Sequence, residues 1–270
     1  MIREGGNVIT GRGCSMNLKH RQPVDVIQPS WLNSYEQRID LLWWELVLLN
    51  SNLFTLEKLS AFPFRLFLEP LRGSFFSLVQ VNMFNMCIVT IRKLVEEKDP
   101  RSLTLSRFKQ DVQSHIRPKY RSALDAALDE VKFDVTLSDL LERARKIRNK
   151  RIAHFDREFN LSPEQRGQIR LSLSQLMKLR EGLDRLFETL CFGHGWAVLP
   201  WQYDPRVQHP LDLDTRSDIE ELLDGVAKDS HILNMPEQQP DFWPHFREGL
   251  SEEELQMLNE YRTKFGLKKV

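Results

Sequence analysis

A run of nineteen residues without a charge, Gly73–Ile91, constrains the fold more than any other part of this sequence. Such a run must be buried, either in a protein core or in a lipid bilayer, and its length approaches that of a membrane span. Three polar side chains near its centre, Gln80, Asn82 and Asn85, would be costly in a bilayer. The run also continues directly into a charged segment. We therefore expect a core helix of a soluble protein, over about residues 74–97.

Helical periodicity extends over most of the chain. Apolar residues recur every three to four positions, and Ser34, Thr104 (or Ser102) and Ser162 are candidate N-caps. The expected helices cover residues 34–62, 74–97, 102–112, 118–131, 137–155 and 162–190. No convincing hairpin pattern occurs before residue 190. Five or six helices without a sheet predict an all-α bundle.

The sequence divides into three parts. Residues 1–33 show no sustained period and are expected to form a loosely ordered lead-in, residues 34–192 the helical bundle, and residues 193–270 an acidic, loop-rich extension. Within the extension, residues 204–258 hold fourteen acidic and four basic residues, a charge of minus ten. Two short helices are expected there, at 216–228 and 251–265. The extension is either a brake, which lies over a basic surface and competes with an anionic ligand, or an independent appendage.

Charge and cysteine usage limit the functional classes. Thirty-eight basic and thirty-eight acidic residues cancel, so only the distribution of charge can indicate a nucleic-acid or membrane partner. Cys14, Cys87 and Cys191 cannot form a disulfide framework, and the N-terminus lacks the apolar core of a signal peptide, which together fit a cytoplasmic protein. Cys191 and His194 have a metal-ligand spacing but no second pair, and no P-loop, dinucleotide-binding or HExxH motif occurs. We expect no metal and no cofactor.

The densest positive stretch is Arg143–Arg157, with seven basic residues and one acidic residue. A solvated helix face is the simplest explanation for such a run, but this one contains a histidine in the string RNKRIAHFD. Histidine exchanges protons near neutral pH, and arginine stabilises the negative charge of a phosphoryl group. An arginine and a histidine are the minimum set for cleaving RNA through its own 2′-hydroxyl, without a metal.

Helical geometry supports this chemistry in part. Arg148, Arg151 and His154 form an i, i+3, i+6 stripe, but in a regular helix Arg148 and His154 lie about 120° apart. One chain therefore need not bring both side chains to one phosphate, whereas two chains packed by symmetry could do so.

At these residues the sequence resembles a known family. RNKRIAH, residues 148–154, matches the Arg-polar-x4-His motif of the HEPN superfamily, helical domains that include many toxin and antiphage ribonucleases. AHFD and the upstream IRKLVEEKDPRSLTLSRF are similar to the branch associated with abortive infection in bacteria, and the resemblance spans residues 34–192. It implies a metal-independent endoribonuclease, active as a homodimer, in which Arg148 and His154 are catalytic and Asn149 is the supporting polar residue.

Further roles follow as expectations. The side chains expected to contact RNA phosphates are Lys150, Arg151, Arg145 and Arg92. Asn82, Asn85 and Arg92 share one face of the apolar helix, where they either satisfy one another inside the bundle or line a cleft beside His154. The expected partners are RNA, a second copy of the chain, and an antitoxin or another defence component. Two other functions stay open: a non-catalytic helical module that binds RNA or a protein through residues 143–157, and a structural dimerisation domain.

Overall fold

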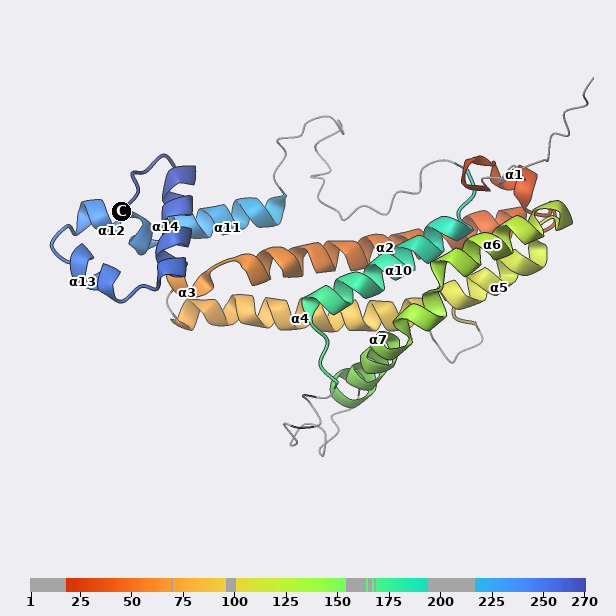
Figure 1. Ribbon diagram of the computed structural model, residues 1–270, viewed down its shortest axis with the longest axis horizontal. Coiled ribbons are helices and arrows are strands. Elements are labelled where there is room, and N and C mark those ends of the chain that lie inside the picture. The colour runs from red at the N-terminus through yellow and green to blue at the C-terminus, as the bar shows by residue number, and fades with distance from the viewer. Residues whose placement is uncertain are drawn as a thin grey trace, which may run out of the picture.

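The computed structural model describes residues 18–68, 70–95, 101–153, 164, 167, 169–193 and 217–270. Regular secondary structure in these residues is helical, apart from one isolated antiparallel bridge between Ile27 and Ile116. The molecule is elongated: two long helices run side by side, further helices pack along one half of this pair, and the C-terminal helices lie at its other end (Figure 1). The predicted all-α fold is confirmed.

The long pair is an antiparallel hairpin. It consists of α2 (Leu32–Ala61), the short α3 (Phe64–Phe67) and α4 (Pro70–Val95). Lys93 Nζ lies 2.5 Å from Glu45 Oε1, and Gln80 Nε2 donates a hydrogen bond of 2.9 Å to the carbonyl of Leu59. Residue 93 therefore lies opposite residue 45, and residue 80 opposite residue 59, which defines the register of the hairpin.

Shorter helices complete the bundle. They are α5 (Leu105–His115), η2 (Pro118–Tyr120), α6 (Arg121–Val131), α7 (Phe133–Ile147), the π-helical segment η3 (Arg148–Ala153) and α10 (Leu173–Leu190). The amphipathic helices pack their apolar stripes against the hairpin and against one another, so that Phe108, Leu124 and Phe187 are completely buried in one continuous core.

The predicted start of a helix agrees with the structure where a side chain caps the helix. Thr104 accepts a hydrogen bond of 3.2 Å from a backbone N–H in the first turn of α5, as predicted. The prediction for Ser34 is wrong: α2 begins two residues earlier, directly after the buried Trp31, and Ser34 lies inside the helix. Helix α10 starts with a capping box at Ser172, whereas the predicted cap Ser162 lies outside the described residues.

Residues 18–33 are packed against the bundle, which corrects the prediction of a loosely ordered lead-in. The short segments η1 (Leu18–His20) and α1 (Pro23–Val26) precede α2, and Val26 and Ile27 are completely buried. These segments are too short to show a period in sequence, and their burial depends on a distant partner, Ile116. Residues 1–17 lie outside the described part of the chain.

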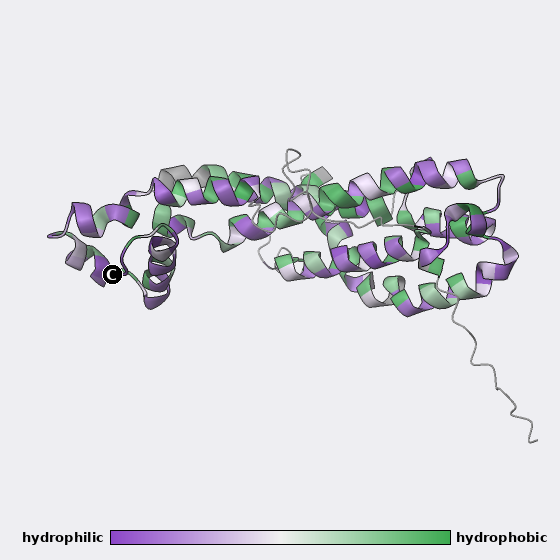
Figure 2. Cartoon of the chain, turned by 90° about the horizontal axis from the view of Figure 1, so that it is seen from above, coloured by the Kyte–Doolittle hydropathy of each residue, from purple (hydrophilic) through white to green (hydrophobic). Residues whose placement is uncertain are grey.

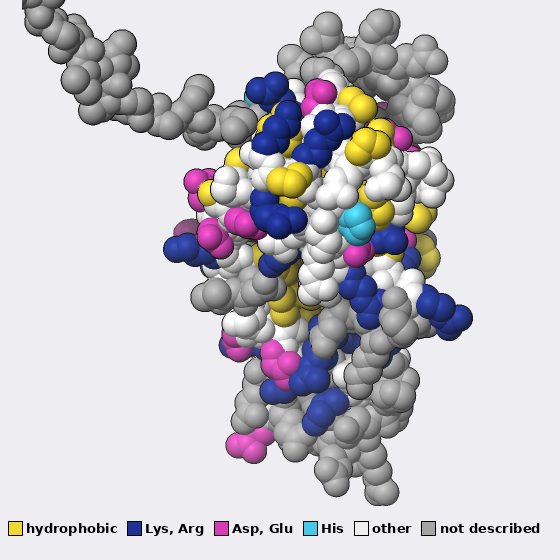
Figure 3. All heavy atoms as spheres, turned by 90° about the vertical axis from the view of Figure 1, so that its right-hand side faces the viewer, with side chains coloured by type: hydrophobic (Ala, Val, Ile, Leu, Met, Phe, Trp, Pro, Cys, Tyr) yellow, Lys and Arg dark blue, Asp and Glu magenta, His cyan; other side chains and the backbone are white. Residues whose placement is uncertain are grey.

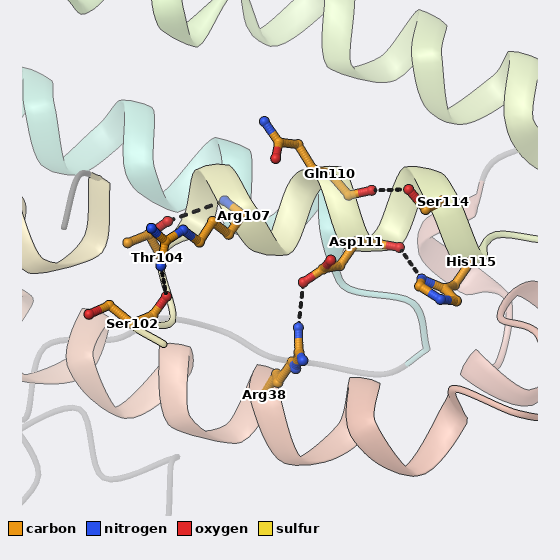
Figure 4. A network of polar contacts seen from close by, with 8 residues as sticks. All are labelled: Arg38, Ser102, Thr104, Arg107, Gln110, Asp111, Ser114 and His115. Atoms are coloured by element: carbon orange, nitrogen blue, oxygen red, sulfur yellow. Dashed lines mark hydrogen bonds and ion pairs between the residues drawn. The ribbon is translucent and has the colours of Figure 1, made fainter. Parts of the chain in front are cut away.

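A polar network ties the start of α2 to α5 (Figure 4). Arg38 forms an ion pair with Asp111, and His115 Nδ1 donates a hydrogen bond of 2.8 Å to the carbonyl of Asp111. The His115 ring stacks on Trp31 with 4.7 Å between ring centroids, and the Arg38 guanidinium lies 5.6 Å from the Trp31 ring centre. Trp31 is thereby held at the junction between the N-terminal segment and the bundle.

Four helices follow the bundle in the C-terminal part. They are α11 (Asp218–Lys228), α12 (His231–Gln238), α13 (Trp243–Glu248) and α14 (Glu252–Lys264). α11 and α14 agree with the two predicted helices, but α12 and α13 lie in the segment between them, where the loop-rich extension was not expected to be helical. Its prolines suggested the loop; Pro244, however, stands in the first turn of α13, where a helix does not need the missing N–H. The four helices share a second hydrophobic core with Phe62 and Phe67 at the tip of the hairpin.

The apolar helix α4 is only partly a core helix. Its C-terminal half is buried through Cys87, Ile88 and Ile91, whereas Phe75 and Leu78 in its N-terminal half are 62% and 58% exposed. By length and composition Phe75–Val95 could also cross a membrane, and 22% of it is buried inside the protein. Figure 2 shows hydrophobic residues along the length of the long hairpin. The prediction of a buried helix therefore holds for one half of α4 and is wrong for the other.

Candidate functional site

The basic stretch that begins at Arg143 spans the last turns of α7 and all of η3. On α7 the positive charges are paired along the helix: Arg143 lies 2.9 Å from Asp139, and two nitrogens of Arg145 each donate a 2.7 Å hydrogen bond to Glu142. Exposed pairs of this kind contribute little stability, but they offset the charge of the arginines. The cations that follow these pairs in the described part of the stretch, Arg148, Lys150 and Arg151, belong to η3.

The pKa of Glu142 reflects the positive charges around it. Its pKa lies below the ordinary value, first because Arg145 donates hydrogen bonds to the carboxylate, and further because of the positive charges of Arg145, Lys146 and Arg92. Arg92 belongs to α4, so the hairpin adds its own charge to the basic stretch of α7. The structure thus places Arg92, a predicted phosphate ligand, near Arg145, another predicted phosphate ligand.

The motif RNKRIAH lies where the α-helix changes into a π-helix. Residues Arg148–Ala153 are π-helical, with hydrogen bonds from i to i+5 in place of the i to i+4 bonds of an α-helix. The i, i+3, i+6 stripe predicted for Arg148, Arg151 and His154 assumed a regular α-helix, so that geometric argument is wrong. Widened turns of this type are frequent at functional sites.

Arg148 and Asn149 are exposed at the start of this π-helical segment. Arg148 Nη1 donates a 3.1 Å hydrogen bond to Asn149 Oδ1, which restricts the guanidinium of Arg148. Lys150 is half-buried. His154, the predicted proton-transfer residue, lies outside the described residues, so its catalytic role stays a prediction.

Arg151, three residues further along η3, lines a cavity of about 690 Å³ between α2, α4, η3 and the segment before α10. The other described residues of the wall are Leu56, Ser60, Gln80, Val81, Phe84, Ile147, Ile169, Arg170 and Leu171. The cavity thus adjoins the motif through Arg151 and brings a second arginine, Arg170, to the same place.

The polar residues of α4 do not satisfy one another. Asn82 is exposed, and the buried Oδ1 of Asn85 has no hydrogen-bond partner among the described residues. Arg92 acts on Glu142 of α7 instead. Mutual satisfaction of Asn82, Asn85 and Arg92 inside the bundle is therefore wrong as an explanation of these side chains.

Positive charge also occurs at the end of the molecule formed by α1 and the connection between α5 and α6. Figure 3 views this end and shows Lys and Arg side chains spread over it, interspersed with Asp and Glu side chains. Arg21, Lys119 and Arg121 are among the exposed residues of these segments. Exposed basic side chains of the bundle are therefore not confined to η3.

The described acidic helices lie away from this basic surface. Figure 1 shows α11–α14 at the tip of the hairpin, apart from α7 and η3, and Glu220 of α11 pairs there with Lys58 of α2 at 2.5 Å. For residues 217–270 this position favours an appendage packed on the hairpin over a brake that covers the basic stretch.

The comparisons with known proteins agree with the helical architecture and with the resemblance to HEPN domains. The family model of the AbiU2-type HEPN domain matches residues 33–208, which include the hairpin, α5–α7, η3 and α10. The chain belongs to the AbiU2 family of HEPN domains. Membership of the AbiU2 family associates it with abortive-infection defence, and HEPN domains are often ribonucleases. Comparisons with curated proteins and with solved structures give no match.

The cavity beside the motif of this AbiU2 domain was missed by reasoning from the sequence. Ser60, Gln80, Arg151 and Arg170 come from four separate segments, and no spacing links them. The one signal of the cavity in the sequence was Gln80, an amide in the middle of an apolar helix. Its side chain lines the cavity, which explains a polar residue at this position.

Proposed function

We propose that this AbiU2 domain is a metal-independent endoribonuclease of abortive-infection defence that acts in the cytoplasm. One observation carries the proposal: the RNKRIAH motif of a HEPN domain starts at a π-helical turn, with Arg148 and Asn149 exposed and hydrogen-bonded to each other. An antitoxin or another defence component would control such an activity.

The reaction proposed for the site is transfer of the RNA phosphate to its own 2′-hydroxyl. The 2′-oxygen forms a bond to phosphorus while the bond from phosphorus to the 5′-oxygen of the next nucleotide breaks. A histidine at position 154 takes the proton of the 2′-hydroxyl, and a second histidine gives a proton to the leaving oxygen. The products end in a 2′,3′-cyclic phosphate and a 5′-hydroxyl, and DNA is not a substrate because it lacks the nucleophile.

The other side chains of the motif bind and stabilise the phosphate. Arg148 stabilises the additional negative charge in the transition state, and Asn149 orients the Arg148 guanidinium. Flanking phosphates are bound by the remaining cations of this surface: Lys150, Arg151, Arg145 and Arg92. Since each chain supplies one histidine at this site, the proposed active form is a homodimer.

The hairpin offers a surface for this homodimer. Two exposed apolar stripes face away from the core at helical spacing, Leu41, Trp44 and Leu48 on α2 and Phe75, Leu78 and Met86 on α4. The register of the hairpin puts these stripes at opposite ends of it. A twofold axis across the middle of the hairpin would therefore lay the α2 stripe of one copy on the α4 stripe of the other, as an isologous interface requires.

The size of the stripes suits a stable dimer. From their exposed fractions, the six side chains offer roughly 650 Å² of accessible surface per subunit, compared with about 800 Å² per partner in an interface of standard size. Exposed apolar surface of this extent is uncommon on a protein that remains a monomer.

The proposal is tested by incubating the purified full-length protein with mixed RNA in EDTA. We expect fragments, and a rate that falls by roughly 10²–10⁴ in His154→Ala and Arg148→Ala. Arg247→Ala, which removes an exposed arginine of α13 in the C-terminal part, is the matched control and should cleave like the parent protein. Binding of RNA with steep salt dependence but without cleavage would instead identify a non-catalytic module.

A further inference from the structure

The cavity next to η3 has a mostly apolar wall and the volume of a ligand-binding site. Its apolar wall comes from α2, α4, α7 and the segment before α10, and the half-buried Phe84 contributes an aromatic ring. A volume of about 690 Å³ lies well within the range of about 300–1,000 Å³ that is typical of cavities for small organic ligands. The cavity is therefore large enough for a ring system, rather than for an inorganic ion alone.

The polar part of the wall selects for an anion with hydrogen-bonding groups. Among the described residues that line the cavity, none is acidic, whereas Arg151 and Arg170 are both exposed and have no ion-pair partner in the described part of the chain. Gln80 Nε2 donates to the carbonyl of Leu59, so its amide is held in place and keeps its Oε1 as an acceptor. Ser60 adds an exposed hydroxyl at the rim.

We propose that this cavity binds one nucleotide of the RNA substrate, with the base inside and a phosphate held between Arg151 and Arg170. This inference rests on the proposed function and names a substrate subsite for it. An aromatic ring and apolar side chains accept the flat face of a base, a fixed amide can pair with its edge, and two guanidinium groups match a phosphate.

The position of the cavity relates it to the cleavage site. Arg151 stands three residues after Arg148 in the same π-helical segment, so a phosphate held by Arg151 lies one or two nucleotides from a phosphate held by Arg148. A base inserted into the cavity fixes the register of the strand at the scissile bond, which gives the enzyme a preference for the nucleotide at that position.

Two substitutions test the subsite without touching the motif. Ser60→Trp fills the cavity from an exposed position of α2, and Glu57→Trp places the same side chain on an exposed position outside the cavity wall as its control. Arg170→Gln removes one guanidinium from the wall, and Arg247→Gln removes an exposed arginine of α13 in the C-terminal part as its control. Circular dichroism and thermal melting establish that each full-length variant is folded.

The measurements are calorimetric binding of nucleoside monophosphates, of the matching nucleosides and of inorganic phosphate, together with anisotropy of a labelled RNA decamer in the His154→Ala background. We expect Ser60→Trp to weaken monophosphate and nucleoside binding at least tenfold. Arg170→Gln should weaken the monophosphates about three- to tenfold and leave the nucleosides unchanged. A monophosphate should compete with the decamer, which separates a substrate subsite from an independent site for free nucleotide.

Unchanged binding of monophosphate and of RNA in both Ser60→Trp and Arg170→Gln would overturn the inference, as would inorganic phosphate that binds as tightly as a monophosphate. Binding of a monophosphate without competition with the decamer would also overturn it. The proposed function fails separately: if no RNA is cleaved while Ser60→Trp still weakens nucleotide binding, the subsite stands and the ribonuclease does not. If RNA is cleaved equally by Ser60→Trp and Glu57→Trp, with the same sequence preference, the ribonuclease stands and the subsite does not.

Discussion

Leu78→Glu should dissociate the proposed homodimer. Leu78 is 58% exposed on α4, in the middle of an apolar stripe, and the twofold axis would bury it twice in each dimer. Its exposed part is roughly 100 Å², so at about 25 cal/mol per Å² each copy contributes about 2.5 kcal/mol, or about 5 kcal/mol per dimer. Complete loss of this contribution would raise the dissociation constant of the dimer more than about 10³-fold. Buried area converts incompletely to affinity, so we expect the dissociation constant to rise at least about a hundredfold.

The measurement is sedimentation equilibrium over a range of protein concentrations. Leu222→Glu is the matched control, because Leu222 is a leucine with a similar exposure, 52%, on α11 of the C-terminal part. We expect Leu78→Glu to be a monomer at concentrations where the parent protein and Leu222→Glu are dimers, and to lose RNA cleavage with the dimer. Equal dimerisation of Leu78→Glu and Leu222→Glu, or a parent protein that is monomeric and active, would refute the assignment of this surface.

Three further predictions concern stability. Burial raises the pKa of Asp184 on α10 to about 6, against the lowering effect of Arg180, so the folded state holds an extra proton between about pH 4 and pH 6. The free energy of unfolding should therefore fall as the pH rises through this window. Asp184→Asn should remove that slope in denaturant titrations. Arg262→Ala removes a completely buried guanidinium that donates to the carbonyls of Leu233 and Lys268, and it should cost about 3 kcal/mol. Hydrogen exchange should become faster in α12–α14 while the bundle stays protected. Tyr35→Phe removes a buried hydroxyl that bonds two backbone groups at the end of α10, each at 2.9 Å, and should cost about 1–3 kcal/mol by urea unfolding. An Asp184→Asn variant that keeps the pH slope would contradict the first prediction, and an Arg262→Ala or Tyr35→Phe variant as stable as the parent would contradict the second or the third.

The bundle was predictable because its signals are local. The period of apolar residues defined α2, α4 and α10, and the cap at Thr104 defined the start of α5, since both depend on residues within a few positions of each other. The start of α2 was not predictable from Ser34, because the packing of Trp31 extends the helix. The burial of Val26 likewise depends on residues about ninety positions away in the sequence.

The candidate site divides in the same way. RNKRIAH is contiguous, so Arg148 and Asn149 were found from the sequence. The π-helical turn was not, because its sequence contains neither a glycine nor a proline that would mark a departure from regular helix. The wall of the cavity joins Ser60 to Arg170 only through the packing of the hairpin against the segment before α10. Residues that only tertiary packing brings together have no characteristic spacing in the sequence, so they cannot be recognised from it.

The central claim is RNA cleavage by the 2′-hydroxyl at Arg148 and His154, and the chemical ends of the products test it most directly. An RNA oligonucleotide and a copy with one 2′-deoxynucleotide at the preferred cleavage position are incubated with the protein in EDTA and analysed by mass spectrometry. We predict 2′,3′-cyclic phosphate and 5′-hydroxyl ends from the RNA, and no cleavage at the deoxynucleotide. Products with a 3′-hydroxyl and a 5′-phosphate, cleavage at the deoxynucleotide, or activity that requires magnesium would contradict the account.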